Sequence, residues 1–282
     1  MLTSDLIRQI NDFVHAKPRT IQEVAQVTGK NWRTADSYVE RISREQGTIS
    51  VRTFRGGTRG ALKIVFWNNL ERIHSHIAQE NLFQRIIQGR HKTDFSPLDI
   101  YQYVDEKKRH AFIEHCESEE QLLKHDFVSL LRSAQEQILF FSGNLSWTRL
   151  KQGKMPMLQL LEELAKNNIS IKILTRIELP GVENILDVEA INHRLGREAL
   201  EIRHAMQPLR GLLIDKKLAR FKEIKNPQDF KDGELAKQLF IFYNLHDEEW
   251  VEWCNKIFWH LFRTAIPYQK RIGDLRTIQK LL

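Results

Sequence analysis

Two short apolar runs separated by an amphipathic segment constrain the fold of this 282-residue chain more than any other feature. The first run, EQILFFSG at residues 136–143, predicts a short buried strand. The segment MLQLLEELAKNNISIKILTRI, residues 157–177, predicts a helix, a turn and a second buried strand. A strand, a crossover helix and another strand in succession place the two strands parallel in one sheet. The C-terminal two thirds of the chain therefore predict an α/β domain.

Further elements of this domain follow from the same patterns. Segments 200–205, 209–223 and 237–245 predict more strands, and a helix is expected over about 118–134. The segment DEEWVEWCNKIFWHLFRTA, residues 247–265, predicts an amphipathic helix whose apolar stripe belongs to the core. That stripe includes Trp250, Trp253, Ile257 and Leu261.

The N-terminal third has a different order of elements. Apolar spacing predicts a helix over 4–16, and Thr20 with Glu23 forms a capping box for a short second helix that Gly29 ends. Asn31 is a good cap for a third helix that runs to about residue 45. Two alternating strands joined by RGGTRG then predict a hairpin. This is the order of a winged helix-turn-helix domain.

The positive charge of the chain lies mostly in this N-terminal part. Residues 1–95 hold 15 Lys/Arg against 9 Asp/Glu, whereas residues 96–282 hold 28 against 27. A basic winged helix predicts contact with duplex DNA, with the third helix at the major groove and the hairpin tip at phosphates. A protein-interaction role is the alternative, and Trp32 either contacts DNA or packs on the preceding helix. The candidate DNA-binding residues are Lys30, Asn31, Trp32, Arg33, Ser37, Arg52, Arg55, Thr58, Arg59 and Lys63.

A connector rich in charge and histidine is expected over 69–116, with two helical stretches around a loop at 89–97. An apolar stripe on the first stretch predicts dimerisation through a second copy of the chain. The dispersed histidines of this region are interpreted as surface residues and not as metal ligands. The stripe comprises Ile73, Ile77, Leu82, Phe83, Ile86 and Ile87, and the histidines are His74, His76, His110, His115 and His125.

The stretch RHAMQPLRGLLIDKK, residues 203–217, resembles the H-x-K-x4-D signature of the phospholipase D superfamily, with departures. With Asp215 on the motif aspartate, Arg210 takes the lysine position and Pro208 the histidine position. The order over 117–267 resembles one phospholipase D-like domain, and the whole chain resembles the TrmB family of archaeal transcriptional regulators. In the enzymes of the superfamily the histidine attacks phosphorus and the lysine neutralises phosphate oxygens.

The resemblance implies a scaffold without catalysis, because proline has neither a nucleophile nor a proton to transfer. His204 lies four residues before the motif position, so catalysis by its imidazole would require a different path of the strand. Arg210 is expected either to hold an anion or to pair with Asp215. Ser142 and Asn144, with Trp147, lie in a loop after the first strand and are weaker ligand candidates beside a plain turn.

The domains are thus expected at 1–68 for the winged helix, 69–116 for the connector and 117–282 for the phospholipase D-like domain. The leading hypothesis is a dimeric DNA-binding transcriptional regulator, not an enzyme, with a small anionic ligand as a candidate effector and no cofactor or metal. The alternatives are a phosphodiesterase or nuclease using His204, Arg210 and Asp215, and a protein-interaction adaptor. Cys116 and Cys254 form no metal or redox motif. With no apolar run long enough to span a bilayer, a cytoplasmic, nucleoid-associated protein is expected.

Overall fold

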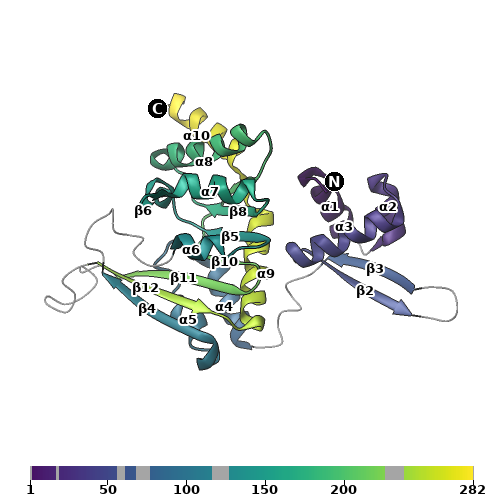
Figure 1. Ribbon diagram of the computed structural model, residues 1–282, viewed down its shortest axis with the longest axis horizontal. Helices are drawn as coiled ribbons and strands as arrows, with labels where there is room; N and C mark the ends of the chain where they lie inside the picture. The colour runs from purple at the N-terminus through teal and green to yellow at the C-terminus, as the bar shows by residue number, and fades with distance from the viewer. Residues whose placement is uncertain are drawn as a thin grey trace. The chain divides into compact units, whose positions relative to one another are not determined.

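A computed structural model describes residues 2–16, 19–55, 61–67, 77–115, 127–225 and 238–281 (Figure 1). The chain divides into two compact units, Met1–His76 and Ile77–Leu282, and each is considered by itself.

The N-terminal unit is a winged helix-turn-helix, as the sequence predicts. Its strands form a three-stranded antiparallel sheet in the order β1-β3-β2. The capping box is present: the Thr20 hydroxyl accepts the Glu23 backbone N–H, and the Glu23 carboxylate accepts the Thr20 N–H. Gly29 ends the second helix with φ of 62°, a conformation that glycine adopts without strain. The elements are α1 (Ser4–Ala16), β1 (Arg19–Thr20), α2 (Ile21–Thr28), α3 (Trp32–Glu45), β2 (Ile49–Arg55) and β3 (Ala61–Trp67).

A single apolar core joins the three helices to this sheet. Ala35, Val39 and Ile42 form the inward stripe of α3, and each is buried. They pack with side chains from α1, α2 and the sheet, including Ile10, Val24 and Val65. Because this core fixes the inner face of α3, the outer face of that helix is the one that meets solvent.

The C-terminal unit contains one large sheet and its covering helices. Its helices are α4 (Ile77–Gln88), α5 (Leu98–Tyr101), α6 (Phe127–Arg132), α7 (Met157–Lys166), α8 (Val182–Leu195), α9 (Glu248–Thr264) and α10 (Tyr268–Leu281). Its strands are β4 (Arg109–His115), β5 (Gln137–Phe141), β6 (Lys151–Gln152), β7 (Met155–Pro156), β8 (Ser170–Thr175), β9 (Leu200–His204), β10 (Gly211–Ile214), β11 (Leu218–Lys225), β12 (Leu239–Leu245) and β13 (Ile266–Pro267). Short 3-10 turns lie at Glu106–Lys108, Ser146–Arg149 and Leu179–Gly181.

The eight-stranded sheet has the order β13-β9-β8-β5-β10-β11-β12-β4. Strands β5, β8 and β9 are parallel, and the pairing of β5 with β8 confirms the strand–helix–strand unit predicted from the sequence. From β10 onward every neighbouring pair is antiparallel. The sheet therefore changes character between β5 and β10.

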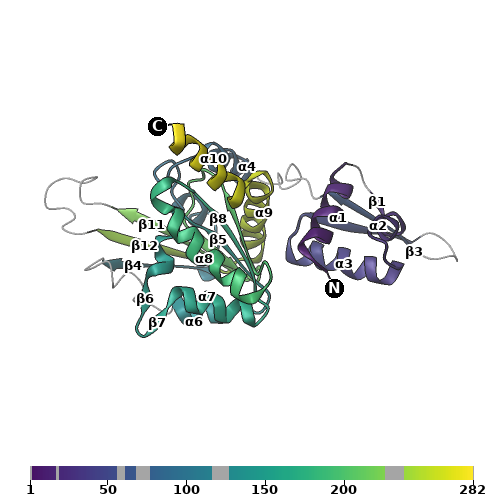
Figure 2. The same cartoon turned by 90° about the horizontal axis from the view of Figure 1, so that it is seen from above.

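Helices cover the two faces of the sheet differently. Ile138 and Phe140 of β5 belong to a core cluster with α7, α8 and α10, whereas Phe141, one residue on, meets Phe258 of α9 on the opposite face. Figure 2 shows α9 and α4 on one side of the sheet and α6 and α7 on the other. Helices on both faces of a mixed sheet, after a winged helix, confirm the α/β class and the architecture predicted from the sequence.

For the second half of the predicted connector, the prediction of a helix was wrong. The charge-rich sequence predicts a helix there, but residues Arg109–His115 form strand β4 at the edge of the large sheet. Phe112 stacks on Phe242 of the neighbouring strand at 5.0 Å between ring centroids. The backbone of β4 pairs with β12 over its full length, and this pairing outweighs the helical propensity of its charged residues.

The apolar stripe of the first connector helix faces the same chain. Leu82, Phe83 and Ile86 of α4 are buried, and Phe83 contacts His260 of α9 edge to face at 5.2 Å. Three residues of the stripe are thus packed within the C-terminal unit, and dimerisation through this helix stays a prediction from the sequence. Ile73 lies outside the described residues.

Candidate functional site

The N-terminal end of α3 carries the exposed part of the predicted DNA surface. Asn31 accepts the Thr34 N–H with its side chain, at 2.9 Å, and thereby caps the helix. Lys30, Arg33 and Ser37 are exposed, and Trp32 exposes 43% of its surface, with the Lys63 ammonium 6.0 Å from its ring centroid. Positive backbone dipole and cationic side chains coincide at this helix end. Among the described residues, no carboxylate lies within ion-pair distance of Lys30 or Arg33.

Lys63 of β3 has a different environment from these residues. Its ammonium group lies 2.7 Å from the Asp36 carboxylate and 3.2 Å from that of Glu40, both on α3. The hydrogen bond that the Lys63 ammonium donates to the Asp36 carboxylate is the main reason that the pKa of Lys63 is raised. This cation therefore fastens β3 to α3, and its charge is compensated within the unit.

The remaining DNA-binding candidates belong to the hairpin. Arg52 and Arg55 lie on β2, and the placement of their side chains is outside the described part of the chain. Thr58 and Arg59 fall entirely outside it. These four residues stay predictions from the sequence.

The loop after β5 is held rigidly by polar contacts. The Ser142 carbonyl accepts the side-chain amide of Gln207, and the Gly143 carbonyl accepts the Arg176 N–H at 2.7 Å. The Ser142 hydroxyl accepts the indole N–H of Trp147 at 3.2 Å. The Asn144 carbonyl accepts the side-chain amide of Asn184. The loop thus forms a fixed rim at the carboxyl end of β5.

Arg210 lies against this rim, just before β10. Its guanidinium donates to the carbonyls of Gln207 and Leu209, at 3.2 and 2.7 Å. A β-carbon at Gly143 would come within 3.0 Å of the Arg210 Nε, so glycine lets the guanidinium lie close to the loop backbone. Burial, and secondarily the charge of Arg176, lower the pKa of Arg210 to about 10. The group remains cationic at neutral pH, and no carboxylate of the described residues forms an ion pair with it.

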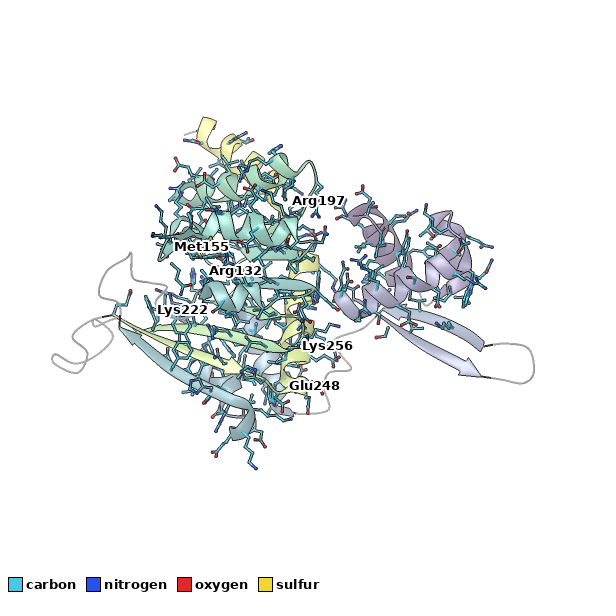
Figure 3. The ribbon with its side chains drawn as sticks, in the orientation of Figure 1. Arg132, Met155, Arg197, Lys222, Glu248 and Lys256 are labelled. Carbon is cyan, nitrogen blue, oxygen red and sulfur yellow. The ribbon has the colours of Figure 1, made fainter. Side chains whose placement is uncertain are left out.

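Arg210 opens into a cavity of about 260 Å³ on the face of the sheet that α7 and α8 cover elsewhere. This "anion pocket" combines the Ser142–Asn144 loop and Arg210 with cations of β11 and with aromatic rings. Arg220 donates to the Asn244 side chain at 2.7 Å, and Lys222, labelled in Figure 3, lies 3.6 Å from the Phe240 ring centroid. The aromatic lining residues are Phe112, Phe127, Phe140, Phe141, Trp147 and Phe242.

Strand pairing aligns the wall of the pocket. The Lys222 N–H donates to the Arg210 carbonyl, Lys222 pairs with Phe242, and Phe242 pairs with Phe112. These residues form one row across β10, β11, β12 and β4, which runs from cationic to aromatic side chains. Gly211 permits the close approach of β10 and β11, because a β-carbon there would collide with the Arg220 carbonyl.

His204 and Asp215, the other ligand candidates, are not brought to this pocket. His204 is buried on β9, where its Nδ1 accepts the Ile177 N–H at 2.9 Å. Burial, with the charge of Arg271, lowers the pKa of His204 and keeps the ring neutral. Strands β8 and β5 separate β9 from β10, so His204 lies roughly 14 Å from the Arg210 strand at about 4.8 Å a step.

Asp215 directly follows β10, and its side chain has a structural role. Its carboxylate accepts the backbone N–H groups of Gln135, Glu136 and Gln137 at 2.7–2.9 Å, which anchors the start of β5. The Arg210–Asp215 ion pair considered in the sequence analysis is therefore not formed. Pro208 is buried, with its ring against Gly89.

Sequence reasoning missed the far wall of the pocket. Phe112, Arg220, Lys222 and Phe242 come from strands far apart in the chain, and residues 109–115 were expected to be helical. The aromatic and β-branched pair Phe112 and Ile113 in RHAFIEH is the signal that favours a strand there.

The predicted surface histidines do not assemble a metal site in the described residues. His110 is exposed and stacks on Phe112, and no three histidine, cysteine or acidic side chains gather there in a way that would hold an ion. His74, His76 and His125 lie outside the described ranges, as does Cys116, and Cys254 is buried. Over the same ranges, no helix combines the length and apolarity needed to cross a bilayer.

Comparisons with known proteins give likenesses of fold only. No protein-family model and no curated protein matches the chain. A solved structure of TrmBL2, described as an archaeal chromatin protein with a novel mode of DNA binding, matches 93% of this chain and 92% of its own at 14% identity and a TM-score of 0.37. Nuc from Salmonella typhimurium, a phospholipase D family member, matches 57% of this chain and 99% of its own at 11% identity and a TM-score of 0.41. NucT from Helicobacter pylori matches 57% of this chain and 99% of its own, at 10% identity and a TM-score of 0.38.

Proposed function

We propose that the chain is a DNA-binding transcriptional regulator whose winged-helix unit contacts duplex DNA. One observation carries this proposal: the N-terminal end of α3 presents Lys30, Trp32 and Arg33 to solvent beyond a well-formed cap. Recognition helices of this class place that end at base edges and neighbouring phosphates. Arg33 has the planar donor set for a guanine or a phosphate, and Lys30 the point charge for a phosphate.

The ion pairs of Lys63 with Asp36 and Glu40 limit the part of α3 that can contact DNA phosphates. Asp36 and Glu40 place negative charge on the middle of the outer α3 face, next to Lys63. DNA phosphates would be repelled by carboxylates that lacked this partner. The proposed contact therefore centres on the first turn of α3, and Lys63 supports it by holding the two carboxylates.

The test is a mobility-shift titration of the full chain on genomic duplex fragments at two salt concentrations. Arg33→Ala should weaken binding by about tenfold at low salt and lower the slope of log affinity against log salt by about 1 if Arg33 contacts one phosphate. Arg8→Ala, which removes an exposed cation of α1, is the matched control. Equal affinities for the two variants at both salt concentrations would refute contact through α3.

We also propose that the C-terminal unit binds an anion in the anion pocket and does not hydrolyse phosphodiesters. Pro208 stands where the related motif has its histidine, and the His204 Nδ1 is engaged by the Ile177 N–H on a distant strand. Arg210 supplies charge without a nucleophile beside it. An assay with bis(p-nitrophenyl) phosphate and with duplex DNA should give no turnover, and turnover that His204→Ala abolishes would establish the nuclease alternative instead.

A further inference from the structure

The wall of the anion pocket opposite Arg210 is aromatic to a degree that binding of a simple anion does not require. Phe112 and Phe242 stack with their ring planes 16° apart, and both side chains are half-buried on the pocket face of β4 and β12. On the other side of the cavity, Trp147 lies 4.9 Å from Phe140. A planar ligand ring entering this space would meet aromatic side chains from β4, from β12 and from the loop after β5.

Charge and aromatic surface are separated along one row of the sheet. Arg210 directly precedes β10 and Phe242 lies on β12, two strand spacings or about 10 Å away. Lys222 lies between them, with its ammonium group near the Phe240 and Phe242 rings. The pocket thus presents a half-buried guanidinium at one end, aromatic rings at the other and the Lys222 ammonium between them.

We propose that the pocket binds a nucleotide, with its phosphate at Arg210 and its base stacked against the Phe112–Phe242 pair. An inorganic anion would leave the aromatic wall unused, and a purely apolar ligand would leave the half-buried Arg210 without a counter-charge. Bases stack on aromatic side chains without regard to their identity, and arginine recognises phosphate through its planar fork. The cavity of about 260 Å³ is near the lower end of ligand-pocket sizes, about 300 Å³.

This inference deepens the anion site proposed above and is independent of DNA contact by α3. The same chemistry occurs in a free nucleotide and at the 5′ end of a single strand. Calorimetric titration of the full chain therefore uses four probes: adenosine monophosphate, adenosine, inorganic phosphate and a 5′-phosphorylated single-stranded trinucleotide. The monophosphate should bind at least tenfold more tightly than either adenosine or phosphate. The ratio between monophosphate and trinucleotide assigns the source, and either order agrees with the inference.

Two variants test binding of the base and binding of the phosphate separately. Phe242→Ala should weaken binding of the monophosphate about tenfold and leave phosphate affinity unchanged. Arg210→Met should weaken both by about tenfold or more. Tyr103→Ala and Arg197→Met are the matched controls, since Tyr103 stacks on Trp250 and Arg197 donates to the Ala165 carbonyl, away from the pocket lining.

The possible failures are distinguishable. A monophosphate that binds no more tightly than phosphate overturns the nucleotide inference and leaves the anion site in place. Phosphate and monophosphate both failing to bind, or binding unchanged in Arg210→Met, overturns the anion site as well. Because Arg210 is enclosed, near-ultraviolet circular dichroism of each variant checks its fold, and Arg210→Lys provides a second variant that retains the charge while losing the planar fork.

Discussion

Lys63 in the winged helix and Arg210 in the C-terminal unit are both cations on a predicted binding surface, but their surroundings differ. Lys63 lies between the carboxylates of Asp36 and Glu40, whereas Arg210 is surrounded by main-chain carbonyls and apolar side chains. A cation whose charge is met by the fold stabilises the fold. A half-buried cation without such a partner among the described residues can instead bind a ligand that brings the missing negative charge.

The largest effect is expected at a third set of cations, Lys172 of β8 and Arg203 of β9, which share one carboxylate. Lys172 and Arg203 flank Glu201, with contacts of 2.9 and 2.8 Å. Burial opposes ionisation of Glu201, but the two cations outweigh it and lower its pKa. Glu201→Gln leaves both cations without their partner, so the free energy of unfolding in urea at pH 7 should fall by about 3 kcal/mol.

The ion pairs of Glu201 also predict how the stability of the protein depends on pH. Because the folded-state pKa of Glu201 is depressed, its stabilising contribution is present above the unfolded-state value of about 4.3 and is lost as the pH falls through the folded-state pKa. The stability difference between the native chain and Glu201→Gln should therefore narrow in acid. Glu163→Gln, which breaks the exposed pair with Arg132, is the control and should change stability little. An equal loss in both variants would contradict the distinction.

The next largest effect is expected on the affinity for phosphate when Arg210 is replaced. Arg210→Met removes charge-assisted hydrogen bonds to the ligand phosphate, so phosphate affinity should fall by roughly 2 kcal/mol, or about thirtyfold. Titration calorimetry against Arg197→Met measures the difference. Affinity that survives in Arg210→Met would show that Arg210 is as structural as Lys63.

The compensated lysine should affect folding and not recognition directly. Lys63→Met leaves Asp36 and Glu40 facing each other without a cation, and we expect the winged-helix unit to lose about 1 kcal/mol of stability. Thermal unfolding followed by circular dichroism, with Lys30→Met as the exposed control, provides the measurement. If Lys63→Met unfolds like the native chain and binds DNA as weakly as Arg33→Ala, Lys63 is instead a DNA contact.

The smallest effect has the opposite sign. Asp36→Asn removes negative charge from the outer face of α3 and releases Lys63 from its main partner, so affinity for duplex DNA at low salt should rise by about threefold. The gain should disappear as salt increases, because screening weakens the electrostatic attraction. Glu45→Gln, at the other end of α3 beside Arg41, is the matched control. A fall in affinity would place Asp36 in direct contact with DNA.

Local signals were sufficient for the winged helix. The Thr20–Glu23 capping box, the Asn31 cap and the glycine stop at Gly29 each act within a few residues, and each appears in the structure. The exposed state of Trp32 did not follow from such signals, since it depends on how α3 packs as a whole. The pairing of Lys63 with Asp36, 27 positions apart, depends on the register of a hairpin against a helix.

The pocket illustrates what local signals do not reach. The loop at Ser142 and the cation at Arg210 were identified because they neighbour a strand and a motif. Phe112 and Phe242 become neighbours only through the β12–β4 pairing, which joins residues 130 positions apart in the chain. Asp215 is the one residue that matches the phospholipase D signature in type. Its carboxylate nevertheless accepts three main-chain N–H groups, because the tight turn after β10 directs it toward β5.

The contact between Gly89 and Pro208 joins the residue after α4 to the segment before β10. A β-carbon at Gly89 would come within 2.8 Å of the proline ring and 3.2 Å of the Arg85 carbonyl, so only glycine lets the chain run this close to Pro208. Any larger residue at position 89 would have to displace the proline ring or the backbone of α4. The end of α4 and the segment that carries Arg210 are therefore expected to move together.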